Sequence, residues 1–191
     1  MRLSPIYVLV LLLVSFGLQA RTISDITIAE EVRMDTDGPV LNLNGAALRR
    51  TYMIVRTYIG GLYLENPTHN GARIIESDEH KRMLFHVLLK RVTARKIARA
   101  LREALVVNIS REEQERLEPQ IKQFLDMFQG KLYRNDQVSI DYIPGLGTKV
   151  SIAGVEKGVI PGKRFFDALL SVWIGNEPVS ETFKNNILGI N

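Results

Sequence analysis

Predicted strands and helices alternate in blocks along this chain, and that order constrains the fold more than any other feature of the sequence. Four helices are predicted in two pairs, at residues 94–108 and 111–128 and at residues 165–174 and 179–188. Strands are predicted before and between the pairs, at residues 23–34, 40–44, 48–64, 82–89, 137–143, 147–153 and 155–160. Segregated strands and helices joined by hairpin-like turns are typical of an antiparallel sheet covered by helices, not of a doubly wound parallel sheet. The sequence therefore predicts an α+β fold.

Local signals mark the ends of the first helix pair. Thr93 is a preferred N-cap residue, and Ser110 followed by Glu113 forms a capping-box pattern at the start of the second helix. Pro119 lies inside that second helix and predicts a kink or a split there, because proline cannot donate the helical hydrogen bond.

Turn chemistry is concentrated near the first strands. Residues 35–39 read Asp-Thr-Asp-Gly-Pro, a strong turn sequence. Asn44 and Gly45 have the composition of a hairpin turn. Beyond them, residues 48–64 are predicted to form one long strand.

The first twenty residues have the composition of a secretory signal peptide. Arg2 supplies the positive charge, residues 6–16 are mostly apolar, and Ala20 is a small residue at the expected cleavage site. This apolar run is short for a membrane span, although an uncleaved anchor is the alternative interpretation. We therefore expect residues 1–20 to be removed and residues 21–191 to form the mature domain.

The composition indicates the cellular compartment and the kind of fold expected for that mature domain. The chain has no cysteine, so its stability must come from packing and not from disulfides. Its length suits a single domain with a substantial core. No later apolar run approaches eighteen residues, so no stable membrane span is expected after signal cleavage. We expect a periplasmic protein exported by a bacterium.

The charge pattern and the histidines exclude several classes of site. The basic stretch at residues 90–102 is interpreted as the solvated face of an amphipathic helix, in preference to a nucleic-acid or lipid-headgroup site. The three histidines are scattered and there is no thiolate, so no metal is expected. No dinucleotide loop or nucleophile elbow is present, and no cofactor is expected.

Two segments that are distant in sequence together resemble the signature of a known superfamily. Residues 43–65 contain NGAALRR and end in GGLYLE, and residues 165–189 read FFDALLSVWIGNEPVSETFKNNILG. They are similar to the two signature segments of the chalcone-isomerase-like superfamily, which includes isomerases, fatty-acid-binding relatives and exported bacterial members. The resemblance implies an open-faced β-sandwich, with an apolar cleft between the antiparallel sheet and its helices.

The resemblance to the isomerases can be carried over one residue at a time. The arginine that stabilises an anionic substrate oxygen falls at Arg49, and a threonine of the isomerases falls at Tyr58. The remaining polar positions of the isomerase network fall at or beside Lys96, Glu103, Val172 and Trp173. Because one of the five polar positions is kept and one becomes a different hydroxyl, isomerase activity is not expected.

The fatty-acid-binding relatives use an arginine and a tyrosine to bind a carboxylate, and Arg49 and Tyr58 match that pair. The odd spacing of the two residues would place them on opposite faces of an unbroken strand. Three alternatives stay open: Arg49 lies in a turn, a bulge intervenes, or Arg50 is the ligand. Arg49 could instead pair on the sheet with an acidic neighbour such as Glu31 or Asp141.

The apolar residues expected to line the cleft would serve equally well as core. They are Ile54, Leu84, Phe85, Ile97, Leu101, Leu105, Phe124, Phe166, Leu170 and Trp173.

Three functions follow from these observations. The first is a non-catalytic periplasmic protein that binds a fatty acid or similar apolar anion. The second is an isomerase or lyase that acts on an unknown substrate. The third is a partner-binding structural module with a filled core.

Overall fold

The computed structural model describes residues 20–190 of the 191-residue chain. The predicted signal peptide, residues 1–20, therefore lies outside the described residues except for Ala20. A seven-stranded antiparallel sheet has the order β11-β10-β9-β6-β5-β4-β3. Its strands are β3 (Glu31–Arg33), β4 (Val40–Thr51), β5 (Val55–Leu64), β6 (Lys81–Val87), β9 (Gln137–Ile143), β10 (Gly147–Ile152) and β11 (Val155–Pro161). This arrangement confirms the predicted antiparallel α+β fold.

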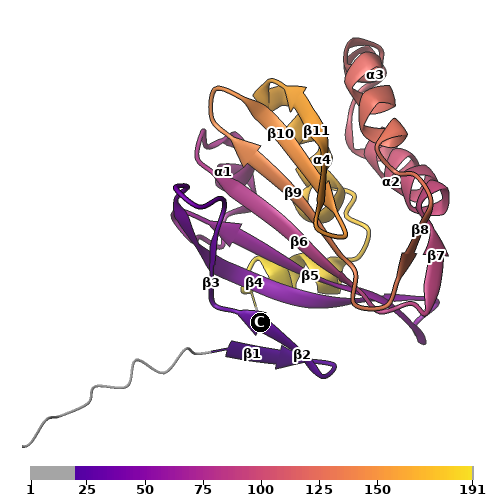
Figure 1. The fold of residues 1–191 in the computed structure, drawn as a ribbon. Helices are drawn as coiled ribbons and strands as arrows, with labels where there is room; N and C mark the ends of the chain where they lie inside the picture. The colour runs from indigo at the N-terminus through magenta and orange to yellow at the C-terminus, as the bar shows by residue number, and fades with distance from the viewer. Residues whose placement is uncertain (1–19, 191) are drawn as a thin grey trace, which may run out of the picture.

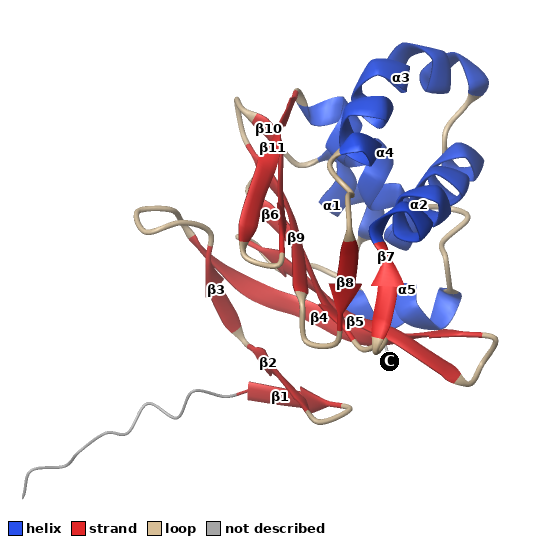
Figure 2. Ribbon diagram, turned by 45° about the vertical axis from the view of Figure 1, so that its right-hand side comes forward, coloured by secondary structure: helices blue, strands red, loops and turns tan. Residues whose placement is uncertain are grey.

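Two small sheets and five helices complete the described part of the chain. The small sheets pair β1 (Ala20–Ile23) with β2 (Ile26–Ala29) and β7 (Arg91–Thr93) with β8 (Lys131–Tyr133). The helices are α1 (Gly71–Glu76), α2 (Ala94–Asn108), α3 (Arg111–Asp126), α4 (Lys163–Ile174) and α5 (Glu181–Ile187). The main sheet is curved, as Figure 1 shows, and Figure 2 shows the helices gathered on one side of it.

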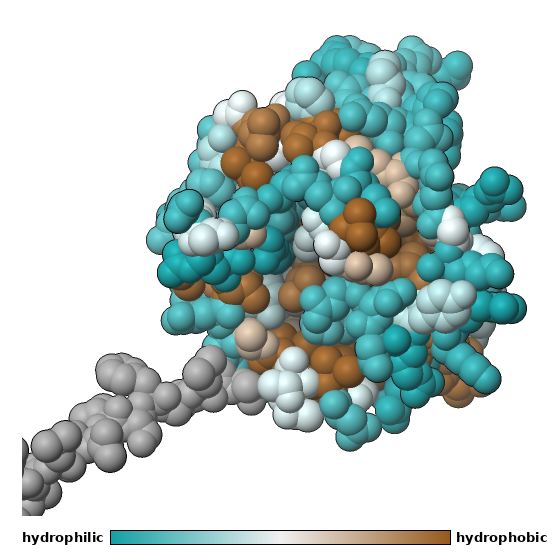
Figure 3. Space-filling view, in the orientation of Figure 1, coloured by the Kyte–Doolittle hydropathy of each residue, from teal (hydrophilic) through white to brown (hydrophobic). Residues whose placement is uncertain are grey.

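The two faces of the sheet are covered unequally. The helical side carries the larger hydrophobic cluster, and α4 lies deepest in it, with Phe165, Phe166 and Trp173 among its buried residues. A smaller cluster on the other face includes Ile28 from β2 and Tyr63 from β5. The outer surface of α2 and α3 is mainly hydrophilic, at the upper right of Figure 3. Among the residues that the structure describes, no helix is long and apolar enough to cross a membrane.

The helix predictions are accurate at the first pair. α2 spans Ala94–Asn108, as predicted, and Ser110 caps α3 by accepting a hydrogen bond from the Glu113 backbone N–H at 3.2 Å. Of the predicted kink or split at Pro119, the split is wrong, because α3 continues through this residue. Proline lacks one hydrogen-bond donor, and the packing of Leu117 and Ile121 holds the helix on both sides of it.

Two strand predictions are wrong. The predicted strand at residues 23–34 is divided by turns into three short strands, and the predicted strand at residues 48–64 is broken by a hairpin turn between β4 and β5. Tyr52 and Met53 in that second turn have positive φ angles of 52° and 63°. The turn has no glycine or asparagine, so the sequence gives no signal of it.

Asn44 and Gly45 do not form the predicted hairpin turn. They lie inside β4, where the register with β5 shifts between Leu43 and Gly45 as in a β-bulge. The Asn44 side chain donates to the Ile187 carbonyl oxygen at 2.9 Å and accepts from the Thr68 N–H at 2.7 Å. The bulge thus fastens α5 to the strand through an asparagine, and Gly45 allows the close approach.

We predict that Gly45→Ala lowers the free energy of unfolding by about 1–3 kcal/mol, the usual cost of overpacking. A Cβ at this position would lie 2.3 Å from the Asn186 carbonyl oxygen and 2.7 Å from that of Ile187, and both are backbone atoms that cannot easily move aside. Gly71→Ala is the matched control, because its Cβ would meet nothing nearer than 3.4 Å. Urea denaturation of the two variants tests the close approach, and equal stability would contradict it.

Candidate functional site

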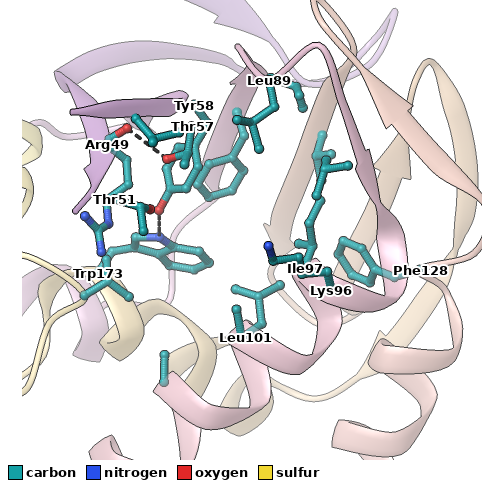
Figure 4. A pocket seen from close by; sticks show the side chains of 18 of the residues that line it. Arg49, Thr51, Thr57, Tyr58, Leu89, Lys96, Ile97, Leu101, Phe128 and Trp173 are labelled. Carbon is teal, nitrogen blue, oxygen red and sulfur yellow. Dashed lines mark hydrogen bonds between the residues drawn. The ribbon is translucent and has the colours of Figure 1, made fainter. Parts of the chain in front are cut away.

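A cavity of about 490 Å³ lies between the sheet and α2. Its walls are mostly aliphatic and aromatic side chains from β5, β6, β9, α2 and α4, and Figure 4 shows part of this lining. The polar or charged side chains in the lining are Arg49, Thr51, Tyr52, Thr57, Tyr58 and Lys96. The cavity is therefore an apolar chamber whose polar groups come mainly from the β4–β5 hairpin.

The hairpin brings Arg49 and Tyr58 together. The two residues are direct partners in the antiparallel register of β4 and β5, so their side chains share one face of the sheet. The odd spacing does not put them on opposite faces, because the chain turns at Tyr52 and Met53 and is not one unbroken strand. The register also shifts between Arg49 and Arg50, which leaves Arg50 opposite Arg56 and outside the cavity lining.

Tyr58 is fixed by the aromatic groups around it. Its ring lies edge-on to Phe85 at 5.3 Å and to Phe183 at 5.7 Å between ring centroids. The indole N–H of Trp173 donates to the Tyr58 hydroxyl oxygen at 3.2 Å, drawn as a dashed line in Figure 4. Because this oxygen accepts from Trp173, the phenol hydrogen can point elsewhere, and no described residue receives it.

Burial raises the pKa of Tyr58 to about 12, while the hydrogen bond from Trp173 and the positive charge of Arg49 pull the pKa in the opposite direction. The phenol therefore stays protonated at neutral pH. It acts there as a hydrogen-bond donor and as a very weak acid.

Arg49 has no acidic partner within the described part of the chain. Its guanidinium donates to the backbone carbonyl of Arg50, and its own carbonyl accepts from the Thr57 hydroxyl at 2.8 Å. The alternative partner Asp141 is held by Arg82 through two hydrogen bonds of 2.7 Å. Glu31 forms no ion pair with Arg49 either. Among the described residues, no carboxylate balances the charge of Arg49, which lines the cavity.

The other predicted site residues are divided between the cavity and the rest of the molecule. Lys96 lines the cavity from α2, across from Arg49 and Tyr58 in Figure 4, and Trp173 lines it from α4. Glu103 does not line it, because its side chain is 65% exposed and pairs with Arg99. Val172 is fully buried in the core next to Trp173 and is also outside the lining.

The apolar residues predicted to line the cleft are also divided between the cavity lining and other parts of the molecule. Phe85, Ile97, Leu101 and Trp173 line the cavity. The remaining expected wall residues lie elsewhere: Leu105, Phe124, Phe166 and Leu170 in the buried core, Leu84 against the other face of the sheet, and Ile54 in solvent.

Sequence reasoning missed three polar groups at the site, Thr51, Tyr52 and Thr57. All three belong to the β4–β5 hairpin, so recognising its turn at residues 52–54 would have indicated them. With Arg49 and Tyr58, they place every polar lining side chain except Lys96 on the hairpin.

The lining favours an anionic ligand with an apolar body. Arg49 and Lys96 are its charged members, and none of the lining residues is an aspartate, a glutamate or a histidine. A cation would find no counter-charge here. General acid–base catalysis near neutral pH would also lack the imidazole or carboxylate that most often performs it.

Comparisons with known proteins agree with this architecture. Residues 20–189 match the model of a family described as chalcone isomerase-like. Among solved structures, a fatty-acid binding protein from Arabidopsis thaliana is similar, with a TM-score of 0.64 and 17% sequence identity, over 83% of this chain and 96% of that one. At this identity the likeness shows the fold alone. No curated protein matches the chain.

We predict that Tyr58 does not ionise near pH 10, where an ordinary tyrosine is half ionised. With a pKa of about 12, only about 1% of Tyr58 would be tyrosinate at pH 10. The measurement is the ultraviolet absorbance of tyrosinate in the folded protein and in Tyr58→Phe. The two curves should coincide up to pH 10, and a signal lost in Tyr58→Phe below that pH would show that the phenol is not shielded.

Proposed function

The chain belongs to the chalcone isomerase-like family, and on that premise we propose that it is a non-catalytic protein that binds a fatty acid or a similar apolar anion. The observation that carries the proposal is the pairing of Arg49 and Tyr58 at the hairpin side of an apolar cavity. The Arabidopsis protein of the same fold is named as a fatty-acid binding protein, which supports this class of ligand.

Arg49 and Tyr58 together suit a carboxylate ligand. A guanidinium can bind both carboxylate oxygens with two parallel hydrogen bonds, which an ammonium group cannot do with the same geometry. The Tyr58 phenol adds a third donor, and its high pKa keeps the hydrogen in place. The hydrogen bond from Trp173 holds the phenol oxygen in place, and the phenol hydrogen is left for a ligand oxygen.

The rest of the cavity suits an acyl chain. Its volume of about 490 Å³ lies within the range of about 300–1,000 Å³ typical of small-molecule sites. Each buried methylene contributes about 0.8 kcal/mol. A twelve-carbon chain would therefore contribute on the order of 9 kcal/mol before the cost of association is subtracted.

The competing functions have less support from the lining. An isomerase or lyase would need groups that move protons at working pH, and the titratable lining residues are Lys96 and two tyrosines. Lys96 lies on the α2 side and not beside the Arg49–Tyr58 pair. A structural module with a filled core would have no reason to keep an apolar cavity between its sheet and α2.

We predict that Arg49→Gln weakens the binding of dodecanoate about 10- to 100-fold, because a charge-assisted hydrogen bond contributes about 1.5–3 kcal/mol. Arg50→Gln is the matched control: it removes the same charge from the next residue, which is exposed and outside the lining. Calorimetric titration measures the affinity. Native mass spectrometry of the protein purified from its own cells should show a lipid-sized mass that Arg49→Gln loses.

Equal affinity of the Arg49→Gln and Arg50→Gln proteins would contradict this site. Failure of the wild-type protein to retain any fatty acid would instead shift the weight to a partner-binding module. Acceleration of chalcone cyclisation that disappears in Arg49→Gln would support the isomerase.

We also propose export to a bacterial periplasm, on the composition of residues 1–20. We predict that the protein recovered from the periplasmic fraction begins at Arg21. N-terminal sequencing measures the start, with a cytoplasmic enzyme as the fractionation control. A protein that keeps residues 1–20 in the membrane fraction would show an uncleaved anchor.

A further inference from the structure

The turn between β4 and β5 exposes three consecutive apolar residues. Tyr52, Met53 and Ile54 are 87%, 88% and 83% exposed, and this hairpin tip extends past the rest of the sheet in Figure 2. Large exposed side chains scattered singly are ordinary, whereas a contiguous group marks a contact surface. The tip therefore has the properties of a contact surface.

The backbone conformation of the tip is unfavourable for the residue types found there. Tyr52 and Met53 both have positive φ angles, a conformation that asparagine and glycine adopt readily and bulky residues do not. Asparagine and glycine here would form the same turn with less strain. The bulky side chains therefore stabilise neither the turn nor the core, which is consistent with a role in contact.

Basic residues surround this apolar tip. Arg50 and Arg56 are both exposed and lie directly opposite each other in the β4–β5 register, an arrangement in which like charges repel. Neither has an ion-pair partner among the residues described. An anionic surface placed against the hairpin would relieve that repulsion.

The neighbouring segment adds to the same charge. The backbone N–H of Leu88 donates to the Thr57 carbonyl oxygen, so the chain after β6 passes beside the hairpin, and exposed Lys90 and Arg91 follow. Residues 38–64 and residues 80–102 contain no aspartate or glutamate. Acidic Glu177 and Glu181 do flank the lining residue Val179; Glu177 precedes it in the segment after α4, and Glu181 is the first residue of α5.

We propose that the β4–β5 hairpin docks on an anionic lipid bilayer, with Tyr52, Met53 and Ile54 in the lipid and the arginines against the headgroups. The combination of apolar side chains with adjacent basic ones is the arrangement that binds anionic membrane surfaces. A protein partner fits less well, because a stable interface buries about 800 Å² on each side and the tip offers three residues.

The docked orientation brings the cavity to the lipid. Tyr52 of the hairpin turn and Val55, the first residue of β5, also line the cavity, together with exposed Lys96 and Ala100 from α2. A lipid acid leaving the bilayer beside the tip would enter between the hairpin and α2 and would meet Arg49 there. This last step rests on the proposed function, whereas the docking does not.

The test is flotation of the chain from Arg21 with fatty-acid-free vesicles, either of phosphatidylglycerol and phosphatidylcholine in equal amounts or of phosphatidylcholine alone. This chain contains both hydrophobic clusters and lacks the apolar residues 6–16, which would bind lipid by themselves. We expect binding to the mixed vesicles that weakens as salt is added.

Two double variants separate the contributions of the apolar and the basic residues. Met53→Gly with Ile54→Ser should bind about tenfold more weakly, and glycine suits the positive φ at position 53, so the turn is kept. Arg50→Gln with Arg56→Gln should bind about tenfold more weakly with a smaller salt dependence. Leu146→Ser with Val155→Ser is the matched control: these residues are 47% and 55% exposed, in or directly beside other turns, and their replacement should leave binding unchanged.

Absence of wild-type binding, or equal binding by the Met53 and Ile54 double variant, would overturn the docking. So would dimerisation in size-exclusion chromatography that this variant abolishes while vesicles stay unbound. Dodecanoate binding in lipid-free buffer is measured separately. Met53 and Ile54 lie outside the cavity lining, so their double variant should keep that affinity within about twofold. A protein that docks but binds no acid would overturn the proposed function alone.

Discussion

The register between β4 and β5 is the constraint on which the candidate site depends. Antiparallel pairing places Arg49 directly opposite Tyr58, and the shift after Arg49 turns Arg50 toward solvent. A slip of one residue would move every side chain of the strand to the other face. Arg49 would then leave the cavity, and Arg50 would take its place without the bulge geometry. The chemistry of the site is therefore decided by backbone pairing before any side-chain contact is considered.

Helices α4 and α5 support this register because they contact the inner face of the hairpin at two places. Near one end, Asn44 and Gly45 hold α5 against β4 through backbone carbonyls. Farther along, Trp173 from α4 reaches the Tyr58 hydroxyl. Phe183 of α5 packs on the same Tyr58 ring. Two helices that follow each other in sequence thus clamp one hairpin at two places, so the site residues of β5 meet a rigid wall.

The fold class could be predicted from the sequence, as could several residues that line the cavity. Helix α2 and the antiparallel sheet follow from periodicity, capping and the order of elements, which are local signals. The turn at Tyr52 and Met53 could not be predicted, because its residues contradict the usual preference for asparagine and glycine at positive φ. The preferred pair does occur at Asn44 and Gly45, where tertiary packing of α5 makes it a bulge.

Some residues of the candidate site could be predicted from the sequence and others could not. Arg49 and Tyr58 were identified through the resemblance, but their common face required the structure to show a hairpin in place of one strand. Glu103 was placed near the cleft because one helix position cannot be distinguished from its neighbours without knowing which side of α2 faces the sheet. The cavity itself was beyond prediction, since apolar residues that line a space and apolar residues that fill one have the same composition.

Four energetically unfavourable features of this structure lie together toward one end of the β4–β5 hairpin. Bulky residues occupy left-handed backbone positions at Tyr52 and Met53, and Arg50 faces Arg56 across the strands. Nearby, Arg49 has no carboxylate partner within residues 20–190, and an apolar cavity leaves its lining without packing contacts on one side. The other part of β4 shows the opposite pattern, with Asn44 satisfied and Gly45 fitted to its neighbour. Departures from locally favourable structure tend to concentrate at functional sites, so the clustering of these four features at one end of the hairpin supports both the binding and the docking proposed for it.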